Sequence, residues 1–214
     1  MVKEILDIPG IRQALKGKLL ISILAGVSSE QIETTLYPDN SAAHQDQEKC
    51  QVVRAMPNTA AMLRESMTVI SSTVPLPPER DALVTWIFSS IGKVVHLPPS
   101  NMDVSTALAG SAPAFAALAL EGLVQGAVAM GMPRAEAQLI ASQVMRGAAA
   151  MVQHGESPSE VREKISTPGG CTIGGLLVLE ETAVRGNLAR SVREATCVAS
   201  KLGLGQTNVN GTRP

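Results

Sequence analysis

Aromatic residues are scarce in this chain, and their scarcity restricts both its core and its partners. Phe, Trp and Tyr together make up 2% of the 214 residues, although hydrophobic residues make up 45%. A buried core must therefore be built from closely packed Ala, Val, Leu, Ile and Met. The 18 Lys and Arg residues against 19 Asp and Glu residues give a net charge of −1, and no basic run is interleaved with aromatics. We therefore expect no nucleic-acid partner.

Cysteine is also rare, and its spacing fits a reducing compartment better than a disulfide framework. Cys50, Cys171 and Cys197 are far apart and odd in number, which fits a reducing compartment, so we expect a cytoplasmic protein. The sequence has no CxxC motif and no cluster of His residues. We therefore predict no metal site.

A long uninterrupted apolar run is absent as well. A membrane span needs about 20 strongly apolar residues, whereas the least charged stretch, 103–121, is rich in Ala, Gly and Ser and contains Pro113. The segment Met1–Asp7 is charged, which does not fit a secretory signal there. We expect no membrane association.

Residues 1–98 alternate between predicted strands and helices. A helical pattern broken at Pro9–Gly10 comes first, and the apolar run Leu19–Leu24 follows it. This run is apolar on both faces, which is typical of a strand in a parallel sheet covered by helices. Ser28 and Gln31 then form the pattern of a capping box. Further strands are predicted at 52–55, 68–72 and 93–97 and further helices at 32–36 and 77–92, so this part is an α/β unit.

The glycine-rich turn of a dinucleotide-binding domain is missing from the sequence. Such a domain begins with a strand and a G-x-G-x-x-G turn that holds the pyrophosphate, and none of the 214 residues forms this motif. Ala25–Gly26–Val27 nevertheless follows the first predicted strand, at the end of the sheet where such folds bind ligands.

After Pro98–Pro99 the pattern is wholly helical. The segment 105–130 predicts one helix kinked at Pro113, about 39 Å long, which a small domain cannot cover by itself. We therefore expect it to pack on another subunit. Gly122 and Gly126 offer a flat face for close helix approach, although such a spacing can also simply be tolerated.

The remaining helices are predicted at 134–153, from Ser157 through Lys164, up to Glu181, and from Gly186 to Leu202. The helix predicted after residue 153 begins at Ser157–Pro158. The helix predicted at 134–153 carries an apolar stripe that we predict to be core: Leu139, Ile140, Val144, Ala148 and Met151. The predicted domains are therefore 1–98 (α/β) and 99–203 (helical), followed by a polar tail at 204–214 that we expect to be disordered.

The segment Ser166–Ile173, with the sequence STPGGCTI, joins two of these helices through a tight turn. Pro168 fixes its φ angle, Gly169 and Gly170 can adopt conformations closed to other residues, and a helix begins near Thr172. Free N–H groups at that helix start would suit a carboxylate or phosphate. The same pattern also fits an ordinary helix–loop–helix corner capped by Thr, and spacing alone leaves both interpretations open.

This segment resembles the signature of pyrroline-5-carboxylate reductases, the enzymes of the last step of proline biosynthesis. Three further segments follow the order found in that family: Leu20–Val27, Arg54–Thr59 and Asp103–Pro113. The resemblance implies an oxidoreductase that reduces the cyclic imine of pyrroline-5-carboxylate to L-proline with NADPH or NADH. It also implies a fold that is α/β plus all-α, namely the C-terminal portion of a Rossmann-like NAD(P)-binding domain followed by a helical dimerisation domain, assembled as a homodimer or higher oligomer.

The resemblance also assigns site residues. It implies substrate binding by Thr167, Gly169, Gly170 and Thr172, with backbone amides holding the carboxylate and Thr172 facing the ring nitrogen as the catalytic candidate. Thr172 could instead only cap its helix. The positions that the resemblance places on the cofactor side are Ala25, Gly26, Pro57, Asn58 and Ser111.

The chain departs from the family pattern at several positions. Ala109 and Ala112 replace Ser and Gly, Lys164 replaces an Asn or Gln near the cofactor, and Arg64–Ser66 replaces a glycine-rich turn. The family's glycine fingerprint and first strands have no counterpart here. Two hypotheses therefore remain: a reductase whose sequence starts at an internal methionine, or a non-catalytic fragment that folds and dimerises but cannot bind the cofactor. We expect the 214 residues alone to be inactive.

Overall fold

The computed structural model describes residues 2–38, 49–206 and 209, and these form two compact units. The first unit consists of Met1–Ser111 and Val192–Pro214, and the second of Ala112–Ser191. The domain boundary predicted at residue 98 lies within the first unit. Most of the tail predicted at 204–214 lies outside the described residues, as does the segment 39–48.

The first unit begins with three short helices, α1 (Val2–Leu6), α2 (Ile11–Leu15) and α3 (Ser29–Leu36). The predicted break between the first two is confirmed, because Gly10 precedes α2 with a φ of 89°. The predicted capping box of α3 is also confirmed. The Ser28 hydroxyl accepts the Gln31 N–H at 3.0 Å, and the Gln31 side-chain oxygen accepts the Ser28 N–H at 2.7 Å.

All four predicted strands are present, as β1 (Leu19–Ser22), β2 (Gln51–Met56), β3 (Ser66–Ser72) and β4 (Gly92–His96). They lie in the order β1-β2-β3-β4. The pairs β1–β2 and β3–β4 are parallel as expected, but β2 and β3 are antiparallel. The connection between them runs only from residue 57 to 65, with one short 3₁₀ helix, η2 (Thr59–Leu63), whereas a parallel pair needs a crossover of about a dozen residues or more.

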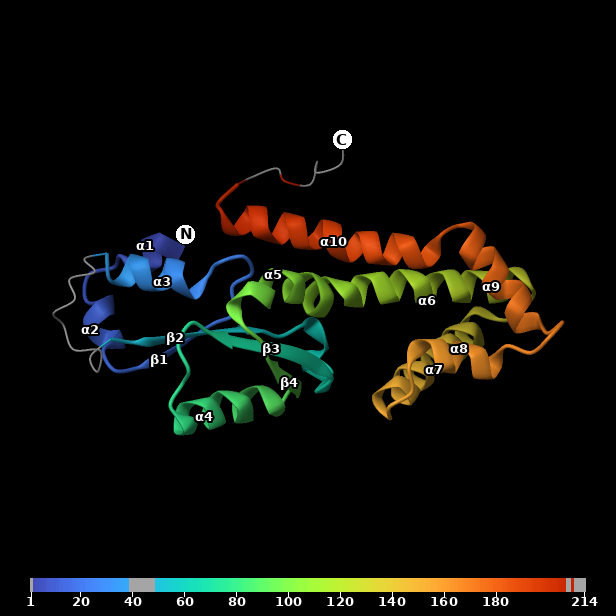
Figure 1. Cartoon of the computed structure of the whole chain (residues 1–214), viewed down its shortest axis with the longest axis horizontal. Helices are drawn as coiled ribbons and strands as arrows, with labels where there is room; N and C mark the ends of the chain where they lie inside the picture. Colours follow the sequence, from blue (N-terminus) through green and yellow to red (C-terminus); the bar gives the residue numbers. More distant parts are fainter. Residues whose placement is uncertain (1, 39–48, 207–208, 210–214) are drawn as a thin grey trace. The chain divides into compact units, whose positions relative to one another are not determined.

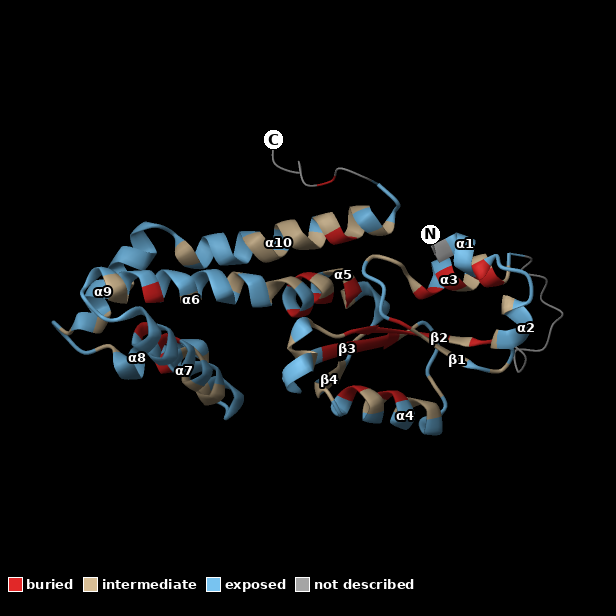
Figure 2. Ribbon diagram, turned by 180° about the vertical axis from the view of Figure 1, so that it is seen from behind, coloured by how far each residue is buried: buried red, intermediate tan, exposed pale blue. Residues whose placement is uncertain are grey.

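Helix α4 (Pro78–Ser89) covers one face of the sheet (Figure 1). Its buried residues Val84 and Phe88 pack with Val53, Ala55 and Ile70 of β2 and β3. Two large apolar residues of this helix lie outside the core, because Leu83 is 47% exposed and Trp86 is 70% exposed. Figure 2 shows the buried residues concentrated in β2, β3 and the inner face of α4.

The other face of the sheet is covered by α1, α3 and the helical run that follows β4. Met56 and Val69 pack there with Met102 of α5 (Met102–Ser105) and with Ala109. Leu19, Leu20 and Ile21 of β1 are only half-buried, so the prediction that this strand is buried on both faces was wrong. Among the described strands β1 lies at the edge of the sheet, and an edge strand is less covered than a central one.

The helix predicted as one piece over 105–130 consists of two types of helix. After η3 (Pro99–Asn101) and α5, residues Thr106–Ser111 form a π-helix, η4, and α6 (Ala112–Ala129) continues from it. Pro113 lacks the N–H that would continue the α-helical hydrogen bonds, and π-turns are one way a helix accommodates such a gap. The run Pro99–Ala129 is long and apolar enough to cross a membrane by length and composition, which alone is weak evidence.

The second unit contains α6, α7 (Arg134–Gln153), α8 (Pro158–Ile165) and α9 (Cys171–Glu181). Helices α6 and α7 pack through Val124, Ala137 and Ala141. The prediction that the large apolar stripe of α7 is core was wrong, because Leu139 is 71% exposed and Val144 is 59% exposed. Small alanines face α6 instead, so the two helices approach closely and leave the larger side chains outside.

Helix α10 (Val184–Gly203) begins in the second unit and ends in the first. Its last turns belong to the first unit and contact the rest of that unit at two points. The Ser200 hydroxyl donates to Asp103 Oδ2 at 2.6 Å, and Gln31 Nε2 donates to the Gly203 carbonyl at 2.9 Å. The C-terminal end of α10 therefore lies beside α5 and the start of α3.

Candidate active site

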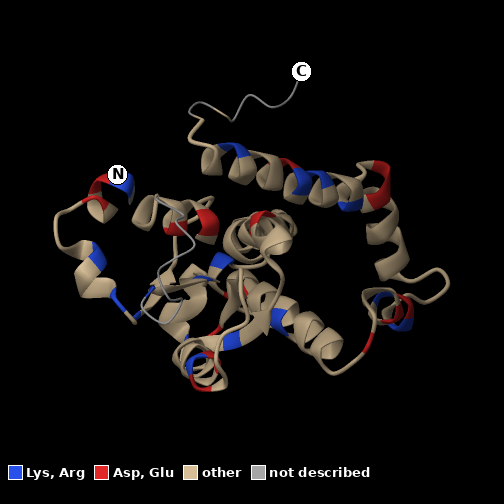
Figure 3. Ribbon diagram, turned by 60° about the vertical axis from the view of Figure 1, so that its left-hand side comes forward, with Lys and Arg blue, Asp and Glu red and all other residues tan. Residues whose placement is uncertain are grey.

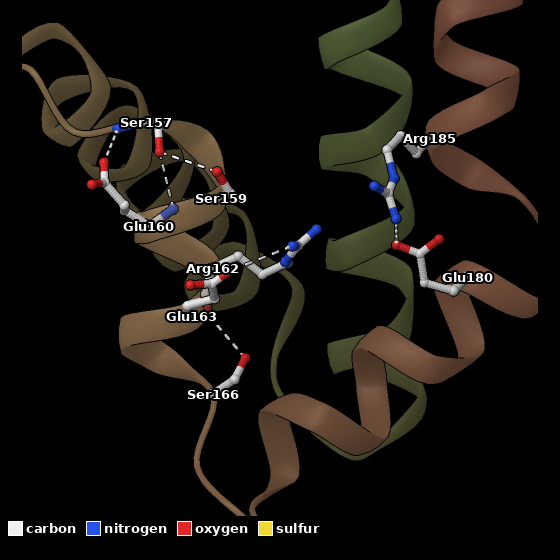
Figure 4. Close-up of polar contacts among 8 residues, drawn as sticks. All are labelled: Ser157, Ser159, Glu160, Arg162, Glu163, Ser166, Glu180 and Arg185. Carbon is white, nitrogen blue, oxygen red and sulfur yellow. Dashed lines mark hydrogen bonds and ion pairs between the residues drawn. The ribbon is translucent and has the colours of Figure 1, made fainter.

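Helix α8 leads the chain to the predicted substrate loop, residues 166–172. A capping box fixes the start of α8: the Ser157 hydroxyl accepts the Glu160 N–H at 3.2 Å, and a Glu160 carboxylate oxygen accepts the Ser157 N–H at 2.7 Å (Figure 4). These hydrogen bonds from Ser157 lower the pKa of Glu160. At the other end, the Ser166 hydroxyl donates to the Arg162 carbonyl at 2.8 Å, which fixes the point where the loop begins.

The loop is a single tight turn. The Gly170 N–H donates to the Thr167 carbonyl at 3.0 Å, with Pro168 and Gly169 between them. Gly169 has a φ of 69°, which is the left-handed region that a turn of type II requires at this position. Proline followed by a left-handed glycine explains why the chain turns sharply immediately before α9.

Helix α9 starts with free donors. Its N-cap is Gly170, which provides no side-chain cap, so the N–H groups of the first turn have neither a helical nor a side-chain cap partner. Thr172 lies in that first turn and is half-buried. The interpretation of Thr172 as the helix cap is therefore wrong, and its hydroxyl makes no hydrogen bond within the described part of the chain. The positive end of α9 suits a carboxylate.

Gly170 is needed for a different reason from the one predicted. Its φ is −78°, which any residue can adopt. A Cβ at this position would lie 2.5 Å from Thr167 Oγ1 and 3.2 Å from the Thr167 carbonyl oxygen, so a side chain there would displace the Thr167 hydroxyl. Because the Gly170 N–H is already bonded to Thr167, the amides that remain for a ligand are that of Gly169 and those of the first turn of α9.

The predicted cofactor residues all lie in the first unit. Ala25 and Gly26 form the turn after β1, where Ala25 is exposed and Gly26 has a φ of 75°. A Cβ on Gly26 would lie 2.8 Å from the Gly203 backbone nitrogen. The space beside Gly26 is therefore filled by the end of α10. Ser111 is half-buried at the end of η4, and Pro57 is half-buried after β2.

Both groups of the Asn58 amide make hydrogen bonds within the first unit. Its Oδ1 accepts the Ala60 N–H at 3.0 Å, and its Nδ2 donates to the Ala109 carbonyl at 3.0 Å. Its backbone N–H donates to Ser66 Oγ at 3.0 Å. Asn58 thus links the turn after β2 to η4.

The departures from the family pattern have structural counterparts. Arg64 adopts a φ of 59°, which lies in the left-handed region that favours glycine, the residue type of the turn in the family pattern. Lys164, where a cofactor contact was in doubt, donates to Glu156 at 2.8 Å and belongs to a surface ion pair.

Sequence reasoning assigned no role to Arg54, although the residue is only 6% exposed. One guanidinium nitrogen donates to the Leu24 carbonyl at 3.4 Å, while Nε has no hydrogen-bond partner among the described residues. Burial lowers the pKa of Arg54, and the negative charge of Asp103 opposes that shift. A charged residue within an apolar strand was the signal that could have identified it.

A separate hollow of about 620 Å³ lies in the first unit, between the end of α3 and the start of β2. Glu33, Tyr37 and Cys50 are among its lining residues. Burial, followed by repulsion from Glu30, raises the pKa of Glu33, and Lys49 acts in the opposite direction. None of the predicted site residues lines this hollow.

Known proteins resemble this chain over nearly its whole length. A family model described as pyrroline-5-carboxylate reductase dimerisation matches residues 99–202. A pyrroline-5-carboxylate reductase of Lophium arboricola is 59% identical over 214 residues, which cover 100% of this chain and 67% of that protein. The Schizosaccharomyces pombe reductase is 41% identical over 201 residues, covering 94% of this chain and 68% of that protein. The chain thus spans about two thirds of the length of these relatives.

Solved structures of pyrroline-5-carboxylate reductases also resemble this chain. The crystal structure of Plasmodium falciparum pyrroline carboxylate reductase with NADP bound has a TM-score of 0.81 and 26% identity, covering 94% of this chain and 77% of that chain. The 1-pyrroline-5-carboxylate reductase of Streptococcus pyogenes has a TM-score of 0.76 and 29% identity, covering 86% of this chain and 67% of that chain. The expected fold, part of a Rossmann-like domain followed by a helical dimerisation domain, is confirmed.

Proposed function

The chain belongs to the pyrroline-5-carboxylate reductase family, which consists of oxidoreductases, and from this premise we propose that its substrate loop binds pyrroline-5-carboxylate for reduction to L-proline. The observation that carries the proposal is the start of α9, where a Thr-Pro-Gly-Gly turn precedes a helix without a side-chain cap. A carboxylate bound there would accept hydrogen bonds from the first-turn amides and face the positive end of the helix.

The chemistry requires orientation more than a strong acid. A bound nicotinamide cofactor supplies the hydride for the imine carbon, and a protonated imine nitrogen makes that carbon electrophilic. Thr172 lies one residue into α9 with its hydroxyl free for a ligand, so it can orient the ring nitrogen or transfer its proton. Thr167 lies at the start of the turn, and its Oγ1 lies close to Gly170.

The residues of this chain fit a nicotinamide dinucleotide only in part. Ala25 is exposed and Ser111 is half-buried, so both remain able to contact a nicotinamide ring. Gly26, however, is packed against Gly203, and the Asn58 amide is bonded internally. No G-x-G-x-x-G motif occurs in the 214 residues to hold the pyrophosphate. We therefore assign NADPH or NADH as the cofactor only to a protein that also contains a diphosphate-binding segment.

The second unit is proposed to form a homodimer or higher oligomer. Leu118 of α6, Leu139 and Val144 of α7 and Leu177 of α9 are between 57% and 71% exposed. Helix α6 carries only one charged residue, Glu121, whereas basic residues recur along α10 (Figure 3). Apolar surface of this kind is normally covered by a protein partner. With three free cysteines, of which Cys171 and Cys197 are exposed, a cytoplasmic location fits this assembly.

The decisive experiment compares the 214-residue chain with a hybrid protein, defined as the Lophium arboricola reductase in which these 214 residues replace the matching region. For the 214 residues we expect no saturable NADPH binding by calorimetry and no NADPH oxidation with pyrroline-5-carboxylate. The reason is that contacts to the pyrophosphate contribute most of the binding free energy of a dinucleotide. The hybrid protein should show both.

Each part of this proposal has its own contradicting outcome. Micromolar cofactor binding by the 214 residues would reveal a nucleotide site elsewhere in the chain. A hybrid protein that binds NADPH but does not oxidise it with pyrroline-5-carboxylate would favour the second hypothesis, a non-catalytic module that folds and dimerises.

A further inference from the structure

The carbonyl group of Ala109 lies close to the point where the π-helix η4 passes into α6. In an α-helix the N–H of residue 113 would donate to the carbonyl of residue 109, but residue 113 is proline and has no N–H. Ala109 is only 8% exposed, and a buried carbonyl without a hydrogen bond costs free energy. A donor from elsewhere therefore stabilises an α-helical turn at this point.

Asn58 is the residue that supplies this donor. Its Nδ2 lies 3.0 Å from the Ala109 oxygen, although the two residues are 51 positions apart in sequence. The orientation of the amide follows from its neighbours, because the Ala60 N–H requires an acceptor and the Ala109 carbonyl requires a donor. A flipped amide would place like groups together at both contacts. The hydrogen bond from the Asn58 N–H to Ser66, which is 2% exposed, fixes the backbone as well.

We propose that Asn58 is a positioning residue whose side-chain amide gives the Ala109 carbonyl the donor that Pro113 cannot provide and thereby stabilises η4 where it joins α6. Ser111 is the last residue of η4, so the hydrogen bond at Ala109 fixes the segment that carries this predicted cofactor contact. Asn58 then acts on the cofactor side of the site through η4 and not by touching the cofactor. That last step rests on the proposed function, whereas the role in η4 does not.

A simpler role for Asn58 would be to cap η2. That role uses only Oδ1, which Asp provides equally well, so Asn58→Asp separates the two roles. The substitution keeps the acceptor for Ala60 and places a carboxylate oxygen against the Ala109 carbonyl. Pro113→Ala is the complementary change, because it returns a backbone N–H to the helix and makes the donor from Asn58 dispensable.

The test is a double-mutant cycle on the 214-residue chain, measured by chemical denaturation with Asn58→Asp, Pro113→Ala and both together. We expect Asn58→Asp to raise the unfolding equilibrium constant about tenfold in the Pro113 background and much less in the Pro113→Ala background. The effect of Pro113→Ala on the unfolded chain cancels in the cycle. Asn101→Asp adds the same charge beside α5, where the asparagine makes no side-chain cap, and should show no coupling with Pro113→Ala.

Two further measurements distinguish positioning from general stability. Hydrogen exchange of backbone amides in 106–112 should rise in Asn58→Asp and return in the double variant, while exchange in β3 stays unchanged. In the hybrid protein, Asn58→Asp should raise KM for NADPH several-fold with kcat less affected, and Pro113→Ala should reverse this. Additive effects in the cycle would overturn the proposed role of Asn58 even if the hybrid protein is active. Coupling between Asn58→Asp and Pro113→Ala in a chain whose hybrid protein is inactive would support the role of Asn58 and contradict the proposed function.

Discussion

Thr172 is the side chain on which the proposed chemistry depends most. Its hydroxyl lies in the first turn of α9, beside the free amides, and the helix cap is Gly170 instead. In the hybrid protein we expect Thr172→Ala to lower kcat/KM for pyrroline-5-carboxylate roughly 10- to 100-fold, which is the effect of one or two lost hydrogen bonds. Steady-state kinetics with both substrates varied would measure this.

The matched control for Thr172→Ala is Thr182→Ala at the other end of α9. The Thr182 hydroxyl donates only to backbone carbonyls of that helix, Val178 and Leu179, at 3.2 Å each. Its removal should leave kcat/KM unchanged. Equal losses in the two variants would show that the effect comes from α9 stability and not from contact with the substrate.

Glu33 should make the stability of the first unit dependent on pH. Burial raises its pKa, so the folded state binds a proton more readily than the unfolded state does. The ionised carboxylate therefore lowers the free energy of unfolding above the usual carboxyl pKa, and this loss disappears as the pH falls below about 4. We expect Glu33→Gln to raise the free energy of unfolding at pH 7 and to have little effect at low pH.

Urea denaturation of Glu33→Gln at several pH values would test this expectation. The exposed residue Glu65 provides the control substitution, Glu65→Gln, whose effect should not follow the same pH dependence. A Glu33→Gln difference that is constant from pH 4 to pH 8 would contradict the argument.

The turn between α8 and α9 depends on two glycines with different physical roles. Gly169→Ala meets open space but places a side chain at a φ of 69°, which should cost about 1 kcal/mol of stability. Gly170→Ala keeps an ordinary φ but forces the Thr167 hydroxyl away from its position. We therefore expect Gly170→Ala to raise KM for pyrroline-5-carboxylate in the hybrid protein more than Gly169→Ala does.

Denaturation midpoints and substrate KM values of the two variants would separate these roles. If Gly169→Ala weakened substrate binding more than Gly170→Ala, the left-handed conformation itself, and not the Thr167 hydroxyl, would be the important feature of the turn.

The assembled protein should be an obligate dimer formed through its helical unit. No atom of the described chain outside its own helix lies within 4 Å of a Cβ placed on Gly126, so Gly126→Leu can be accommodated in a single chain. If a second chain packs on α6, the same change overfills the contact and should weaken the dimer by about 1 to 3 kcal/mol. Sedimentation equilibrium of both proteins would measure the dissociation constants.

A control for this experiment is the helix content of both proteins, measured by circular dichroism at concentrations where both are dimeric. Under those conditions the two should have the same helix content. A stable, well-folded wild-type monomer at micromolar concentration would contradict the dimer itself.

The sequence by itself determined the elements and their order. The four strands, the interruption at Pro9–Gly10 and the capping box at Ser28 were predicted correctly because they depend on local rules: backbone angles, short-range hydrogen bonds and hydrophobic period. The turn before α9 was also predicted, since proline and glycine impose it locally, and the family resemblance named its residues. Which of those residues act on substrate stays a prediction.

Only the tertiary structure decided which side of each element is covered. The periodicity of α7 marks a stripe of large apolar residues but cannot tell whether its own chain or a second one packs there, and alanines turned out to face α6. The antiparallel pairing of β2 with β3 follows from a connection too short for a crossover. The hydrogen bond from Asn58 to Ala109 joins residues 51 positions apart, and no local rule predicts such a contact because it exists only once the sheet and the helix after it have packed together.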